Sequence, residues 1–139
     1  MKRTPELAPL SRDHHLALEH ALKLRRASED DVAAVVAAFL AFIVTDGRAH
    51  FAQEEQLLAP QVPDDRADLV RRMHSEHEEI LRWAEALGRS PDVASARELG
   101  ELLSRHVRFE ERELFPLLER RLPRPRLLEL GRELTRVRA

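Results

Sequence analysis

The sequence contains no cysteine, and this absence excludes several kinds of site. Without thiols the chain can form neither disulfide bonds nor the thiolate ligands of structural zinc and iron–sulfur sites. Tyrosine is absent as well, which argues against a tyrosine-ligated or tyrosyl-radical centre. Any bound metal must therefore be held by histidine, aspartate, glutamate or water.

The chain also lacks an excess of one charge and a long apolar run. The 23 basic and 25 acidic residues are interspersed and leave a net charge of −2, without the footprint of a nucleic-acid binder. The longest apolar run, residues 31–44, is shorter than the roughly 20 residues that span a bilayer, and the N-terminus lacks a signal-peptide pattern. We expect a cytoplasmic protein that binds neither nucleic acid nor membranes.

Helix-forming residues, by contrast, are abundant. Alanine, leucine, glutamate and arginine dominate, and no segment alternates apolar and polar residues for long. The sequence predicts a single domain over residues 1–139, of the all-α class. We expect an antiparallel up-down-up-down four-helix bundle with its core at about residues 10–122, followed by a short helix at about residues 125–137.

Local sequence predicts where these helices begin and break. The caps expected for the first, third and fourth helices are Ser11, Asp64 or Asp65, and Ser95. The second helix should run from about residue 31 to residue 58, with Gly47 marking a bend or the close approach of another helix. Pro116 should kink or interrupt the fourth.

Two segments 56 residues apart repeat one pattern. The sequence HFAQEEQLLAP starts at His50, and HVRFEERELFP starts at His106. Aligned without gaps, they pair His50 with His106 and Glu54 with Glu110. A histidine and a glutamate four residues apart lie on one face of a helix, so each segment presents an imidazole and a carboxylate to the same neighbour.

The first and third helices repeat as well. Aligning Asp13-His14 with residues 76–77 superimposes their apolar faces and pairs His14 with His77. His14 lies near the middle of its apolar stripe, whereas His15 lies at the edge and could be an alternate ligand or an outer hydrogen-bond donor. His74, one turn before His77, could be a fifth imidazole ligand or a residue at the solvent edge.

One buried histidine is ordinarily satisfied by a backbone carbonyl, but six converging polar side chains need a cation to offset their desolvation. The predicted metal ligands are His14, His50, Glu54, His77, His106 and Glu110. Glu55 and Glu111 are expected on the helix surface or behind the ligands, although Glu111 could bind directly if its helix kinks. Imidazole with carboxylate suits iron, with zinc or manganese as substitutes, better than calcium or magnesium.

These motifs resemble the hemerythrin family, specifically the bacterial hemerythrin-like HHE cation-binding domains. The resemblance covers about residues 10–122 and includes the Glu-Glu tails that end at Pro60 and Pro116. It implies a four-helix bundle around an oxo- or hydroxo-bridged di-iron centre, with the four histidines as terminal ligands and Glu54 and Glu110 as bridges. The chain differs from the oxygen carriers of the family at Met73, where they have histidine, and at Glu111, where they have aspartate.

The resemblance also implies a function. We expect binding of O2, another diatomic molecule or peroxide, for oxygen or redox sensing, storage or iron handling, rather than catalysis. One alternative is a di-iron enzyme that reduces peroxide or NO with an external electron donor. The other is a metal-free helical interaction module.

Overall fold

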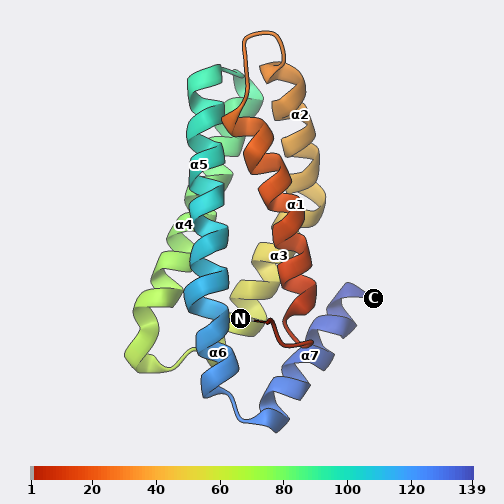
Figure 1. Cartoon of the computed structure of the whole chain (residues 1–139), viewed down its shortest axis with the longest axis vertical. Coiled ribbons are helices and arrows are strands. Elements are labelled where there is room, and N and C mark those ends of the chain that lie inside the picture. The colour runs from red at the N-terminus through yellow and green to blue at the C-terminus, as the bar shows by residue number, and fades with distance from the viewer. Residues whose placement is uncertain (1) are drawn as a thin grey trace.

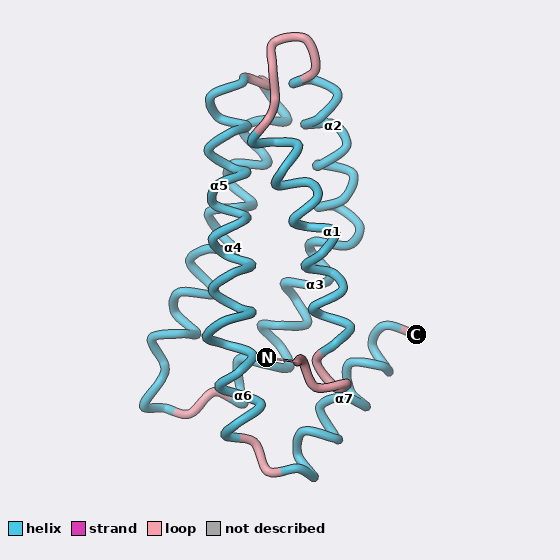
Figure 2. Tube along the Cα trace, viewed as in Figure 1, coloured by secondary structure: helices cyan, strands magenta, loops and turns pink. Residues whose placement is uncertain are grey.

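The computed structural model describes residues 2–139, which form helices, turns and short loops with no strand among them (Figure 2). The α-helices are α1 (Ala8–Arg25), α2 (Val32–Phe42), α3 (Arg48–Gln53), α4 (Ala67–Arg89), α5 (Val93–Phe109), α6 (Phe115–Arg121) and α7 (Arg124–Arg138). Three π-helical turns, Ile43–Gly47, Glu54–Leu58 and Glu110–Leu114, and two 3-10 turns, Ala59–Gln61 and Asp64–Arg66, complete the helical segments. The predicted all-α class is confirmed.

The long helical stretches run side by side and form the body of a bundle (Figure 1). These stretches are α1, the continuous α2–α3 segment, α4, and the continuous α5–α6 segment. Helix α1 makes its most extensive contact with α5, and α5 also packs against α4. Helix α7 lies at the lower end in the view of Figure 1, near the start of α1.

Helix α1 begins at Ala8, earlier than predicted, and Ser11 is not its cap. Pro9 occupies the first turn, where a missing backbone N–H removes no helical hydrogen bond. The Ser11 hydroxyl instead donates to Glu111 Oε2 at 2.7 Å. Ser11, which the sequence suggested as a helix cap, therefore joins α1 to the π-helical turn Glu110–Leu114.

The second stretch contains two π-helical turns that the sequence did not predict. Gly47 closes the first of them, and a Cβ added there would lie 2.8 Å from Ile43 Cδ1 of the same stretch. The sequence left a bend and the close approach of another helix as alternatives at Gly47, and the structure does not show the second, because the tight contact is with Ile43 of the same stretch. π-Helical turns are rare, and they are frequent at functional sites.

The stretch Val32–Gln61 is also long and apolar enough to cross a membrane, with a mean hydropathy that reaches 1.8. The sequence prediction that no segment is long enough to span a bilayer counted only the uninterrupted apolar run. It therefore missed this longer stretch, in which polar residues interrupt the apolar ones. Length and composition do not distinguish a membrane span from a core helix. In this chain the stretch carries two buried polar side chains, those of His50 and Glu54.

The predicted caps of the next two helices are also corrected. Asp64 and Asp65 form a 3-10 turn ahead of α4 and make no side-chain cap. Helix α5 is capped by Asp92, whose Oδ1 accepts a hydrogen bond from the Ser95 backbone N–H at 3.0 Å. Ser95 is therefore inside the first turn, because an aspartate three residues earlier supplies a better acceptor.

The end of the chain follows the sequence prediction more closely. The π-helical turn Glu110–Leu114 interrupts the fourth stretch just before Pro116, as expected from that proline. Helix α7 then buries Leu127, Leu130 and Leu134 and leaves Val137 exposed. Its apolar side closes the lower end of the bundle.

The buried apolar residues form two clusters. The upper cluster includes Ala17, Phe51 and Ile80, and the lower one includes Leu10, Leu58 and Met73. On α1, on α4 and on the stretch that contains α3, the two clusters are about two turns apart, and a buried polar residue, His14, His77 or Glu54, lies in the gap. On α5 the clusters meet within two residues, at Val107 and Phe109, between the buried His106 and Glu110. A polar layer therefore crosses the bundle between two apolar cores.

Helices α1 and α5 are in close contact at Gly100. A Cβ placed on Gly100 would lie 2.7 Å from the Ala21 carbonyl oxygen and 2.9 Å from the Arg25 backbone nitrogen. We expect Gly100→Ala to destabilise the fold by about 1–3 kcal/mol, because backbone atoms cannot move aside as a flexible side chain can. Chemical denaturation of the two proteins measures this difference.

Gly88→Ala is the matched control. Its Cβ would meet only the mobile end of Leu40, at 3.3 Å, and the residue is exposed. Alanine is favoured over glycine inside a helix by roughly 1 kcal/mol, so this variant should be as stable as the parent protein or slightly more stable. Equal destabilisation by both variants would contradict the close approach of α1 and α5.

Candidate metal centre

The π-helical turns position the central residues of the polar layer. One turn begins at Glu54 and the other at Glu110, each four residues after a histidine. In each case the histidine and the glutamate share one side of the helix, and both are buried. The next residue in each turn, Glu55 or Glu111, also contacts a histidine of another helix. Each π-helical turn thus supplies two consecutive carboxylates to the layer.

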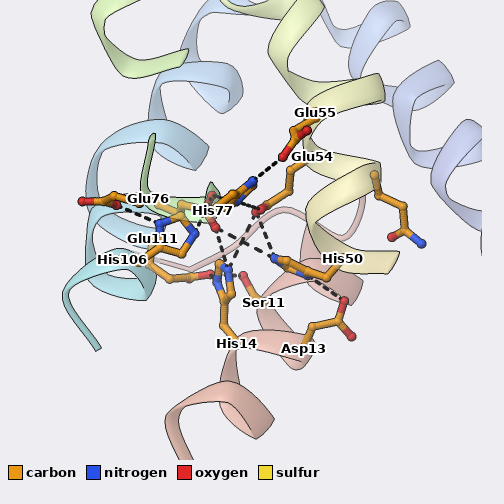
Figure 3. A network of polar contacts seen from close by, with 12 residues as sticks. Ser11, Asp13, His14, His50, Glu54, Glu55, Glu76, His77, His106 and Glu111 are labelled. Atoms are coloured by element: carbon orange, nitrogen blue, oxygen red, sulfur yellow. Dashed lines mark hydrogen bonds and ion pairs between the residues drawn. The ribbon is translucent and has the colours of Figure 1, made fainter. Parts of the chain in front are cut away.

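Glu54 lies among the four imidazoles in Figure 3, and the distances place the other buried glutamate, Glu110, among them as well. Glu54 lies 3.0 Å from His50 Nε2 and 3.0 Å from His77 Nε2. Glu110 lies 2.9 Å from His14 Nε2 and 3.2 Å from His106 Nε2. Each carboxylate therefore contacts one histidine of its own helical stretch and one from another.

These six residues form two overlapping sets of potential ligands, and in each set the ligand atoms lie within 4.8 Å of one another. The first set is His14, His50, Glu54 and Glu110, and the second is Glu54, His77, His106 and Glu110. Both glutamates belong to both sets. The arrangement can hold two cations, each between two imidazoles, with two carboxylates shared between them.

Several buried nitrogen and oxygen atoms of the polar layer lack a hydrogen-bond partner, as expected of metal ligands. Glu54 and Glu110 are 0% exposed, yet one oxygen of each has no hydrogen-bond partner. The Nε2 atoms of His50 and His106 are also buried without a partner. Buried polar groups left unsatisfied are costly, and a cation in each of the two ligand sets would give all four atoms a partner.

A second layer of carboxylates orients the imidazoles from behind (Figure 3). Each Nδ1 faces one of them: Glu111 at 2.6 Å from His14, Asp13 at 2.9 Å from His50, Glu55 at 2.7 Å from His77 and Glu76 at 2.8 Å from His106. A carboxylate that accepts the Nδ1 proton leaves Nε2 free for a metal and makes it more basic.

Arginines anchor three of these outer carboxylates. Arg138 donates to both oxygens of Asp13, at 2.7 and 2.9 Å, and ties the end of α7 to the site. Arg3 donates to Glu111 at 3.1 Å, and Arg72 donates to Glu76 at 3.1 Å. These contacts restrict the carboxylates to the positions from which they can orient the imidazoles.

The charged side chains of the polar layer strongly shift one another's pKa values. Although burial opposes a charged imidazole, Glu110 and Glu54 raise the pKa of His77 to about 10. Glu110 likewise raises the pKa of His106 to about 9. Despite burial, the surrounding imidazoles hold the pKa of Glu110 well below its usual range. The two carboxylates thus create a strong preference for positive charge at the centre.

The remaining candidates from the sequence occupy different places. His15 is exposed on α1 and takes no part in the network. The side chain of His74 is 45% exposed, and its Nδ1 lies 3.7 Å from Glu55 at the outer edge of the site. Glu111 lies behind His14 rather than in the inner set. Met73 is fully buried in the lower apolar cluster.

The sequence did not identify Asp13 and Glu76 as parts of the site. The repeat contained the relevant pattern, because each acid directly precedes a histidine at equivalent positions, Asp13-His14 and Glu76-His77. Each acid, however, contacts the histidine of a different helix, His50 or His106. Such a pairing depends on helix packing and cannot be read from spacing along one helix.

A small cavity lies beside the first set of ligands, with a volume of about 20 Å³. Apart from Asp13, His14, His50 and His106, its lining is apolar: Ala17, Phe42, Ile43, Gly47, Phe51, Leu103 and Val107. A space of about one probe sphere holds a single water-sized molecule. The cavity therefore has room for a very small and preferably apolar guest.

Glu55→Ala tests the outer layer. Glu55 Oε2 lies 2.7 Å from His77 Nδ1, and loss of such a partner typically weakens metal binding by about 10–100-fold. We expect the variant to fill with metal at saturation but to release it at a lower chelator concentration, measured by competition with a chromogenic chelator. Gln56→Ala, at the exposed neighbouring position, should behave as the parent protein does.

A family model described as the hemerythrin HHE cation binding domain matches residues 7–118. This range includes every inner ligand candidate and every outer carboxylate of the polar layer. No curated protein and no solved structure matches the chain. Because the family match spans most of the sequence and contains the whole site, the chain belongs to the hemerythrin HHE cation-binding domain family.

Proposed function

We propose that the polar layer holds two iron ions and that the chain binds O2 or a similarly small molecule beside them. The observation that carries this proposal is the apolar cavity against His14, His50 and His106. A cavity of this size excludes all but the smallest ligands. Oxygen or redox sensing, storage and iron handling are the roles that such binding would serve, in a cytoplasmic protein.

The ligand chemistry supports iron. Four imidazoles with two carboxylates form a mixed nitrogen and oxygen set, which suits iron and can also accept zinc or manganese. Calcium and magnesium prefer sites made of oxygen alone. Glu54 and Glu110 each contact imidazoles of both ligand sets, so both can bridge a pair of ions. When bound, iron supplies reversible redox chemistry and a coordination position for a diatomic molecule.

The protein itself positions the imidazoles and excludes water from the proposed binding site. The outer carboxylates fix the imidazoles with Nε2 inward, and the two apolar clusters cover the layer from above and below. The apolar wall of the cavity keeps bulk water away from the side where a guest would bind. We also propose that the helical stretches have the up-down-up-down order of a four-helix bundle, with both halves of the repeat contributing to the centre.

Metal analysis combined with the visible spectrum tests the proposal. The protein purified after anaerobic, iron-replete expression should contain two irons per chain, and exposure to O2 should produce a charge-transfer band in the visible range. A colourless, metal-free protein would refute the iron centre. Zinc or manganese at full occupancy from iron-replete cells would refute the choice of metal.

A cavity variant tests the small-molecule part separately. Ala17→Val would place additional methyl groups in the cavity beside His14, so iron content should stay at the parent level while O2 binds more weakly. Ala84→Val is the control, because Ala84 is buried in the same apolar cluster but does not line the cavity. Unchanged O2 binding in Ala17→Val would show that the guest does not use this cavity.

A further inference from the structure

A second concave site lies outside the metal centre, on the surface between α4 and α5. Its volume is about 230 Å³, and its lining is Arg72, Arg105, Arg108, Phe109, Arg112 and Glu113. Four guanidinium groups thus surround one site in a chain whose net charge is −2. We refer to this site as the arginine pocket.

The spacing of three arginines explains why they gather there. Arg105, Arg108 and Arg112 follow one another at intervals of three and four residues, which places them on one face of the helical stretch. Arg72 reaches the same place from α4, with its guanidinium carbon 4.1 Å from the centre of the Phe109 ring. Stacking on an aromatic face holds that guanidinium in a fixed plane.

Three of these four charges, those of Arg105, Arg108 and Arg112, have no carboxylate partner among residues 2–139. Among residues 2–139, Arg105 and Arg112 form no ion pair or hydrogen bond through their side chains, and Arg108 donates only to the Ser104 hydroxyl. The single lining carboxylate, Glu113, is half exposed and lies 3.4 Å from Arg72. The pocket therefore retains guanidinium donors that can bind an anion, and guanidinium forks match the oxygens of phosphate and carboxylate groups.

The pocket is also connected to the metal centre. Arg72 Nε donates to Glu76 Oε2 at 3.1 Å, and Glu76 Oε1 lies 2.8 Å from His106 Nδ1. Arg72 therefore contacts both the pocket and the carboxylate that orients His106. An anion that attracts the Arg72 guanidinium would compete with Glu76 for it, and the hydrogen bond of Glu76 to His106 would change in response.

We propose that the arginine pocket binds a small tetrahedral oxyanion of the phosphate class, free or as part of a small molecule, and that Arg72 and Glu76 couple this binding to the metal centre. Binding in the pocket is independent of the proposed iron function, whereas the coupling rests on it. A free ligand is favoured over a membrane surface because the donors converge in a concave site.

Isothermal titration of the metal-loaded protein with inorganic phosphate tests the binding step. We expect one site, and about tenfold weaker binding in Arg112→Gln, which removes one charged donor. Arg26→Gln, an exposed arginine outside the pocket, removes the same charge and should bind as the parent does. Absence of binding, or an equal loss in both variants, would overturn the site. Binding to vesicles that contain phosphoinositide, without binding to phosphate, would also overturn it.

The coupling step is measured as the change in metal affinity when sulfate, a tetrahedral dianion that binds iron weakly, fills the pocket. Linkage requires equal effects in both directions, and couplings of this kind are typically about 5–150-fold. The effect should disappear in Arg72→Gln and return in part in Arg72→Lys. A sulfate effect that persists in Arg72→Gln would overturn the coupling.

Anion binding in the arginine pocket and the proposed iron function can be refuted separately. If phosphate binds to a chain that holds no iron, the arginine pocket stands and the iron function fails. If iron binds while phosphate does not, the proposed function stands and the pocket fails.

Discussion

Glu110→Ala is expected to abolish binding of both metal ions. Glu110 lies at the centre of the polar layer, is completely buried and belongs to both sets of potential ligands. Its removal takes away one of the two shared carboxylates and leaves His14 and His106 without their inward partner. The purified variant should contain almost no bound metal, measured by elemental analysis.

Glu113→Ala is the matched control for this substitution. Glu113 lies in the same π-helical turn, but it is half exposed, contacts Arg72 and belongs to neither set of potential ligands. It should retain the full metal content. Full occupancy in Glu110→Ala would show that the buried carboxylates do not hold the metal and would contradict the assigned ligand sets.

Removal of the metal is expected to lower the stability of the whole fold by several kcal/mol. Four buried atoms of the layer have no hydrogen-bond partner within the protein, and two of them belong to fully buried carboxylates. Without a cation, the buried carboxylates are offset only by imidazoles 3.0 and 3.2 Å away that form no hydrogen bond with the unpaired oxygens. A metal that binds only the folded state contributes its binding energy to folding. For a chain of this size, a fall in Tm on the order of 10 °C follows.

Thermal unfolding with and without a strong chelator measures the effect. The chelator should lower the Tm of the parent protein and leave that of Glu110→Ala unchanged, because that variant has no metal to lose. An equal shift in both proteins would mean that the chelator acts on the fold by another route. No shift in either would show that the polar layer is stable without a cation.

The clustering of the six inner residues could be predicted from the sequence because their spacing follows the helical period. His50 with Glu54 and His106 with Glu110 share a helix face by spacing alone, and the apolar neighbours of His14 and His77 show that they point inward. The structure brings these six residues together as expected. Their roles as ligands remain predictions until metal is measured.

The outer layer and the helix starts were harder to predict, for a physical reason. Asp13 contacts His50 across a helix interface, and the Ser11 hydroxyl bonds to Glu111 one hundred residues away. Such contacts depend on the rotation and offset of packed helices, which local patterns do not report. The π-helical turns were missed for a similar reason, because each adds one residue to a turn without a distinctive sequence.

The cavity makes the surroundings of the two sets of potential ligands unequal. In the repeat, Ala17 of the first half aligns with Ile80 of the second, and Gly47 aligns with Leu103. Ala17 and Gly47 both line the cavity, whereas the second half carries larger side chains at the matching positions. The ligand sets are nearly symmetric, but the space around them is not. Two ions held as proposed would therefore differ in their surroundings, since the cavity touches both histidines of the first ligand set and only His106 of the second.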